Sequence, residues 1–219
     1  MMTNRFQTAL LAGAAALALA GAAHADDAFQ PKAKGTIMLN VRMTDVSPDA
    51  GNSVMTAAGA DTGLKANVSD SYVPTIGRTY FFTDNLAAEL IAGTSDHSVK
   101  AVGGTTNVKI YDTWVLPPVL SLQYHFAPKA KFSPYVGAGV NYMIFYGGSN
   151  KNGFTTKLKD GAGTALQAGF DYALQGKWSL NLDVKKVFFN TKATINGGAL
   201  TSSVDLDPWV VSAGVGYKF

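Results

Sequence analysis

The end of the chain alternates between two kinds of side chain. Every second residue from Trp209 to Phe219 is apolar, and the residues between them are mostly small or polar. A period of two places each set on one face of a β-strand. Because the apolar set carries an aromatic residue at each end, the pattern is typical of a strand that crosses a membrane between two aromatic belts.

The same alternation predicts eight strands along the chain. Their expected ranges are 35–46, 72–82, 86–95, 113–126, 132–146, 164–174, 177–189 and 208–219. Short turns alternate with long segments rich in Gly, Asn, Ser, Thr and Asp. These long segments are 47–71, 96–112, 147–163 and 190–207. The pattern predicts an all-β fold, an eight-stranded antiparallel transmembrane β-barrel with short periplasmic turns and long extracellular loops.

A soluble eight-stranded barrel is the alternative fold, and it would turn its apolar face inward. Here the charged residues fall mostly on the face opposite the aromatic residues, which favours an apolar face directed towards lipid. The chain has no Cys, which excludes disulfides and thiolate metal ligands. Its formal net charge is +3 and it has no basic run with interleaved aromatic residues, so nucleic acid is not an expected partner.

The N-terminus predicts export through a cleaved signal peptide, residues 1–25. Arg5 precedes an apolar, Ala-rich run, and Ala23-His24-Ala25 is an A-x-A cleavage site. The run has about 15 residues, fewer than the roughly 20 that a membrane-spanning helix needs, so a membrane anchor is disfavoured. We expect cleavage after Ala25, with Asp26 as the first residue of an outer-membrane β-barrel over residues 26–219.

The inner face of the predicted barrel carries charge. The polar residues expected to face the lumen are Arg42, Glu89, Gln123, Asn141, Asp171, Asp183 and Lys185. Buried charges are tolerated when they are paired, and a barrel of eight strands is narrow enough for side chains to fill. An ion-pair plug is therefore favoured over a selectivity ring. The apolar residues expected on the same face are Met38, Tyr135, Met143 and Phe145. A hydrophobic solute would enter from outside past Met38, Met143 and Phe145.

Pro117 and Pro118 interrupt a predicted strand. Proline cannot donate to a strand ladder, and a closed barrel has no free edge. The pair would lie in the outer half of the bilayer. There it either opens a lateral exit from lumen to lipid or forms a β-bulge that curves the strand, and the bulge is the simpler explanation.

Two further features leave alternatives open. Gly137 and Gly139 fall on the inner face, where they either leave space for a ligand or make room for bulky neighbours. Arg78 falls on the lipid face, near its middle, where a charge is costly. A bulge at Gly77 would change its facing, or its side chain would turn inward to a carboxylate such as Glu89.

Several motifs together resemble the outer membrane protein W (OmpW) family. They are Leu116-Pro117-Pro118, Gln123-Tyr124-His125-Phe126, the stretch from Pro134 to Tyr142, Thr83-Asp84-Asn85, Glu89-Leu90, Gly169-Phe170-Asp171-Tyr172, Asp207-Pro208-Trp209 and Tyr217-Lys218-Phe219. The resemblance implies an eight-stranded barrel with both ends in the periplasm and a narrow, partly hydrophobic lumen. It also implies passage of small hydrophobic molecules, and use as a phage or colicin receptor in some members. The terminal Phe219 is similar to the aromatic end that the barrel-assembly machinery recognises.

We therefore expect a passive channel for small hydrophobic molecules in the bacterial outer membrane, surrounded by outer-membrane lipid and lipopolysaccharide. The alternatives are a small ion or solute pore, and a structural or receptor barrel that acts through its loops. No enzyme, cofactor or metal site is expected. His97 lies near Ser95 and Ser98, but a Ser and a His close in sequence do not by themselves make a catalytic arrangement. The scattered His residues have no metal-ligand spacing, and no phosphate-cradling glycine loop is present.

Overall fold

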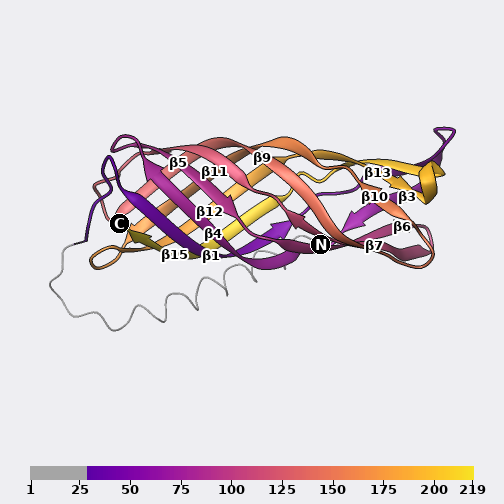
Figure 1. The fold of residues 1–219 in the computed structure, drawn as a ribbon, viewed down its shortest axis with the longest axis horizontal. Coiled ribbons are helices and arrows are strands. Elements are labelled where there is room, and N and C mark those ends of the chain that lie inside the picture. Colours follow the sequence, from indigo (N-terminus) through magenta and orange to yellow (C-terminus); the bar gives the residue numbers. More distant parts are fainter. Residues whose placement is uncertain (1–28) are drawn as a thin grey trace.

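Eight strands of the computed structural model, which describes residues 29–219, close into an antiparallel barrel (Figure 1). In order around the barrel they are β1 (Ile37–Ser47), β4 (Ser71–Phe81), β5 (Leu86–Ala92), β8 (Val119–His125), β9 (Phe132–Asn150), β11 (Gly161–Ala173), β12 (Trp178–Phe188) and β15 (Trp209–Lys218). Pairing between β15 and β1 closes the ring, which confirms the predicted fold class. The predicted signal peptide and its cleavage position between Ala25 and Asp26 lie outside the described residues.

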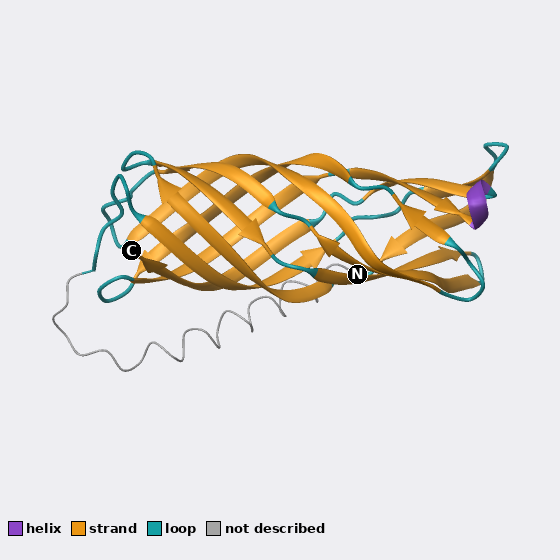
Figure 2. Cartoon of the chain, in the orientation of Figure 1, coloured by secondary structure: helices purple, strands orange, loops and turns teal. Residues whose placement is uncertain are grey.

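Beyond the barrel, the segments expected to be loops form further strands. These are β2 (Ser53–Thr56), β3 (Asp61–Val68), β6 (Ser95–Gly103), β7 (Thr106–Leu116), β10 (Thr156–Leu158), β13 (Asn190–Ile195) and β14 (Leu200–Asp205), with a 3-10 turn, η2 (Asn196–Gly198). They extend the barrel away from its short turns, and β9 runs through both parts (Figures 1 and 2). The segments expected as long extracellular loops are therefore long, and they carry strands over much of their length. We call these strands the extension.

The outer surface of the barrel is apolar between two aromatic rings. Exposed aromatic residues near the short turns are Tyr80, Phe82, Tyr124, Phe126, Phe132, Tyr172, Trp178 and Phe219. Those near the extension are Tyr72, Trp114, Tyr146, Phe188 and Trp209. Between them lie exposed aliphatic residues, including Leu39, Val41, Met43, Ile76, Leu90, Leu120, Leu122, Val140 and Leu166. This is the surface of a lipid-embedded barrel, and the short turns mark its periplasmic end.

Arg78 points outward from β4, and neither of the two expected explanations holds. The strand continues through Gly77 without a register shift. Gly77 faces inward, where an added Cβ would lie 2.8 Å from Arg42 Nη1 and 3.1 Å from Glu89 Oε1. Arg78 is one outward position from Tyr80 in the periplasmic aromatic ring. Its long side chain can therefore reach the headgroups, so it does not lie at the middle of the lipid face.

The barrel crosses its apolar band with strands. In residues 29–219, no helix is long and apolar enough to cross a membrane.

Candidate functional site

A network of ion pairs fills the middle of the barrel. Arg42 on β1 donates from Nη2 to Glu89 Oε1 on β5 over 2.6 Å. Lys185 on β12 lies 3.3 Å from the other Glu89 oxygen and also pairs with Asp183. Glu89 and Asp183 are both fully buried. Because a buried charge is costly unless it is paired and hydrogen-bonded, this arrangement stabilises the closed lumen. We call it the plug.

Amides and a phenol satisfy the remaining carboxylate oxygens of the plug. Gln123 donates to Glu89 Oε2 over 3.1 Å, and Gln167 donates to Asp183 Oδ2 over 2.9 Å. The Tyr135 hydroxyl donates to the same Asp183 oxygen over 2.8 Å. Tyr135, expected as an apolar lining residue, thus belongs to the polar plug.

A second layer of the plug includes Lys32, which the sequence analysis missed. Its Nζ atom donates to Asp171 Oδ2 over 2.7 Å and to Ser133 Oγ over 2.8 Å, and it lies 3.0 Å from His125 Nδ1. The backbone amide of Lys32 bonds to the Pro128 carbonyl, so the segment before β1 folds into the periplasmic mouth. Lys32 precedes the first alternating stretch, and therefore no strand pattern assigned it a face.

The glycines on the inner face of β9 make room for neighbouring side chains. A Cβ at Gly137 would lie 3.2 Å from Gln167 Cγ and 3.3 Å from Gln123 Cγ. A Cβ at Gly139 would contact the Leu120 carbonyl and Ser121. Of the two alternatives, the structure therefore supports close packing, and these positions leave no ligand space.

Replacing Gly139 by alanine should destabilise the barrel by about 1–3 kcal/mol, because the new methyl group meets backbone that cannot move aside. The free energy of urea unfolding in lipid vesicles measures this cost. Gly51→Ala is the matched control, since a Cβ there meets nothing within 4 Å and the backbone angle is not positive. An equal stability of the two variants would contradict the packing described for β9.

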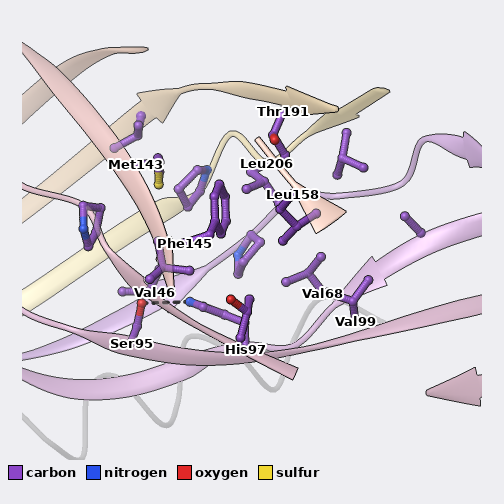
Figure 3. Close-up of a pocket in the computed structure, with 18 of the residues that line it drawn as sticks. Val46, Val68, Ser95, His97, Val99, Met143, Phe145, Leu158, Thr191 and Leu206 are labelled. Carbon is purple, nitrogen blue, oxygen red and sulfur yellow. Dashed lines mark hydrogen bonds between the residues drawn. The ribbon is translucent and has the colours of Figure 1, made fainter. Parts of the chain in front are cut away.

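Above the plug lies an apolar cavity of about 100 Å³ (Figure 3). Its lower wall includes Ile91, Val115, Val119, Met143 and Val187, and Phe145 packs against this cluster. Its upper wall comes from the extension and includes Val54, Ala66, Val99, Ala101, Ile110, Ala193, Ile195 and Val204. Lys185 contributes to the lining from the plug side. The upper wall of this cavity could not be expected from the sequence, because the strands of the extension were not predicted.

The residues predicted to face the lumen lie at different heights along the barrel axis. Met143 and Phe145 line the cavity. Met38, in contrast, packs with Phe81 and Ala87 at the periplasmic end of β1, on the far side of the plug. An entry path past Met38 is therefore wrong. Strand β1 begins at the periplasmic end of the barrel. Met38, its first inward-facing residue, therefore lies far from the extracellular end.

The side-chain amide of Asn141 is buried beside the cavity. It is 3% exposed and pairs across strands with Val119, which lines the cavity. Among the described residues, neither its amide nitrogen nor its amide oxygen has a hydrogen-bond partner. The boundary between plug and cavity thus contains a side-chain amide whose hydrogen-bonding capacity is unused.

The cavity wall contains a break in the strand ladder at the two prolines. Ile91 pairs with Val119, and the next pair is Ser95 with Val115. Each strand advances four residues between these pairs, so neither carries the extra residue that defines a bulge. Residues 92–94 thus face residues 116–118 without a ladder pair. We call this break the window, and it contradicts the bulge explanation for Pro117 and Pro118.

The other borders of the window differ from one another. On the β9 side the wall remains joined, because the Tyr142 amide bonds to the Pro118 carbonyl over 3.2 Å and Leu116 pairs with Ile144. On the β4 side the pairing with β5 ends at Ile76 and Ala92, although β4 itself continues to Ser71. Four residues that border the window also line the cavity. They are Ala92, Gly93, Thr94 and Pro117.

Comparison with known proteins agrees with this architecture. The OmpW family model matches residues 33–219. An outer-membrane protein of Sinorhizobium fredii, y4mB, is 42% identical over 185 residues, which are 83% of this chain and 79% of that protein. Outer membrane protein W of Vibrio cholerae is 34% identical over 199 residues, which are 85% of this chain and 89% of that protein.

A solved structure has the same fold along nearly its whole length. The crystal structure of the outer membrane protein OprG from Pseudomonas aeruginosa superposes with a TM-score of 0.82 at 33% sequence identity. The superposition covers 88% of this chain and 99% of the OprG chain. The family match, the relatives and the barrel geometry agree on the same location, the outer membrane. The chain is a β-barrel protein of the OmpW family.

Proposed function

We propose that this protein is a passive channel that takes small hydrophobic molecules from outside into the apolar cavity and releases them sideways into the bilayer through the window. The observation that carries the proposal is the position of the cavity. The plug closes it from below, and a stretch of barrel wall without ladder pairs borders it on one side. An apolar solute then needs no path through the charged centre.

The plug supports the sideways direction of exit. Its ion pairs and amide hydrogen bonds occupy the lumen from β1, β5, β8, β9, β11 and β12. An apolar solute that crossed this layer would separate ion pairs in a low-dielectric interior, where exposing an unpaired charge is costly. Leaving through the window costs no ion pair, so the lower-energy route runs from the cavity to the lipid.

The pore and receptor alternatives make different demands. A small ion or solute pore needs a continuous polar lumen, whereas here the layer above the plug is apolar. A receptor barrel, for phage or colicin for example, needs only the exposed surface of the extension. Transport and conductance measured on one preparation separate these functions.

The test is flux of a small apolar tracer into vesicles whose outer leaflet is lipopolysaccharide, since that leaflet slows spontaneous entry. We expect tracer flux well above that of protein-free vesicles, with little ion conductance in the same vesicles. Stable conductance without tracer flux would identify an aqueous pore and overturn the proposal. If the folded barrel shows neither tracer flux nor ion conductance, a structural or receptor role remains.

A further inference from the structure

A serine and a histidine lie side by side on the cavity wall at the edge of the window (Figure 3). Ser95 forms the first ladder pair above the window, with Val115. His97, two residues further along β6, directs Nε2 to Ser95 Oγ over 2.9 Å and Nδ1 to the Ser69 carbonyl oxygen over 2.7 Å. Both side chains are buried and both line the cavity.

The contact with Ser69 fixes the protonation pattern of the imidazole. A carbonyl oxygen only accepts hydrogen bonds, so Nδ1 of His97 must carry the proton. Burial lowers the pKa of His97, which lies in the extension outside the membrane-spanning segments, and keeps the ring neutral at neutral pH. Nε2 is therefore an acceptor, and the Ser95 hydroxyl donates to it.

This pair offers hydrogen-bond acceptors to the cavity. In the part of the chain that the structure describes, His97 is the one hydrogen-bond partner of the Ser95 hydroxyl. A hydroxyl that donates to an imidazole is polarised, which makes its own oxygen a stronger acceptor. Rotation of the same hydroxyl also frees Nε2 to accept directly. While the Ser95 hydroxyl donates to Nε2, neither group offers a free proton to a carboxylate or an ester carbonyl.

A second unused group lines the same cavity. The Thr156 hydroxyl on β10 is buried and has no hydrogen-bond partner among the described residues. A hydroxyl can both donate and accept, so Thr156 leaves donating capacity in this cavity. A ligand oxygen is the natural partner for such a donor.

We propose that His97 and Ser95 bind the hydroxyl head of an amphipathic solute, so that the channel prefers small apolar molecules with one hydroxyl group over hydrocarbons of the same size. The inference rests on the proposed function, because it names the substrate class of that same cavity. The head docks at Ser95 while the apolar body contacts Val99 and Met143. Since Ser95 borders the window, the docked solute lies beside its exit.

The cavity size selects the probes for a test. This cavity, at about 100 Å³, is smaller than a cavity of about 150 Å³ that holds benzene, so a single ring or a short chain is the largest probe to test. Toluene and phenol have nearly the same shape and differ by one methyl-to-hydroxyl exchange. Binding of each is measured by NMR on the folded protein in nanodiscs. The methyl shifts of Val99 and Met143 report occupancy, and the side-chain nitrogen shifts of His97 report head-group contact.

The readout is the ratio of phenol to toluene affinity, compared between variants so that partitioning into lipid cancels. We expect Ser95→Ala and His97→Phe each to lower this ratio about five-fold, the change that one ordinary hydrogen bond produces. Thr113→Val is the matched control. Its hydroxyl lines the same cavity but donates to the Trp114 and Tyr146 carbonyls, so the ratio should stay unchanged.

The outcomes separate this inference from the proposed function. If both probes shift Val99 and Met143 but the ratio is the same in Ser95→Ala, His97→Phe and the wild type, the head-group site is wrong and the apolar channel stands. An equal loss in Thr113→Val would show a general polarity effect and also overturn the site. If neither probe shifts Val99 or Met143, the cavity takes no solute and the proposed function itself fails.

Discussion

Replacing Glu89 by alanine should cost about 3–5 kcal/mol of folding stability, since it leaves buried cations without their partner. Glu89 holds Arg42 through one oxygen and Lys185 through the other. Lys185 keeps Asp183, but Arg42 loses its one carboxylate contact in the plug. The free energy of urea unfolding in vesicles measures the loss. Ion conductance of the refolded variant should rise as well, because water must enter to solvate the freed guanidinium.

Two controls separate the effect of breaking the buried ion pair from the effect of losing a carboxylate in general. Asp84→Asn removes the exposed partner of Lys129 and should leave stability close to that of the wild type, because water screens such a surface pair. Arg42→Met combined with Glu89→Leu removes both charges and should recover much of the stability that Glu89→Ala loses, since replacing a buried pair by apolar residues is often neutral. A Glu89→Ala barrel as stable as the wild type would mean that the plug does not depend on this pair.

Alternation predicted which way most side chains point, because a strand has two faces and a closed barrel has one inside. Arg42, Glu89 and Asp183 lie inside on this basis. Alternation did not give height along the barrel. Met38 and Met143 share a face pattern, yet they lie on opposite sides of the plug because β1 and β9 place them at different levels. Height follows from strand register, which depends on pairing between residues far apart in the sequence.

The extension escaped prediction for a different physical reason. Apart from the end of β7, where Trp114 lies, its strands face water on their outer side and lack the exposed aromatic and aliphatic residues that marked the barrel strands. In β6, for example, Val99 and Ala101 point inward while Asp96, Ser98, Lys100 and Val102 occupy the alternating outward positions. Gly, Asn and Thr in such stretches are typical of loops in sequence. The two prolines of the window can be seen in the sequence. That no bulge is present there can be recognised only from the strand pairs on both sides of them.

A disulfide across the window should stop tracer flux, and reduction should restore it. The register that joins Ile91 to Val119 and Ser95 to Val115 places Thr94 opposite Leu116. By alternation with the inward Ser95 and Val115 both residues fall on the outer face of the wall, and Thr94 also borders the cavity, so a Thr94→Cys, Leu116→Cys pair would bridge the break. The natural chain has no Cys, so no other thiol competes. We expect oxidation to lower flux by about ten-fold or more, if the window carries most of the exit.

The matched control is a Leu90→Cys, Leu120→Cys pair on the same two strands. These residues are directly paired in the intact ladder and also point outward, so their disulfide adds a covalent bond where the wall is already closed. Its oxidation should leave flux unchanged. Loss of flux in both pairs would point to a general stiffening of the barrel. Unchanged flux in the window pair, with the disulfide verified by mass, would show that solutes leave the cavity by another route and would exclude the lateral exit at Pro117 and Pro118.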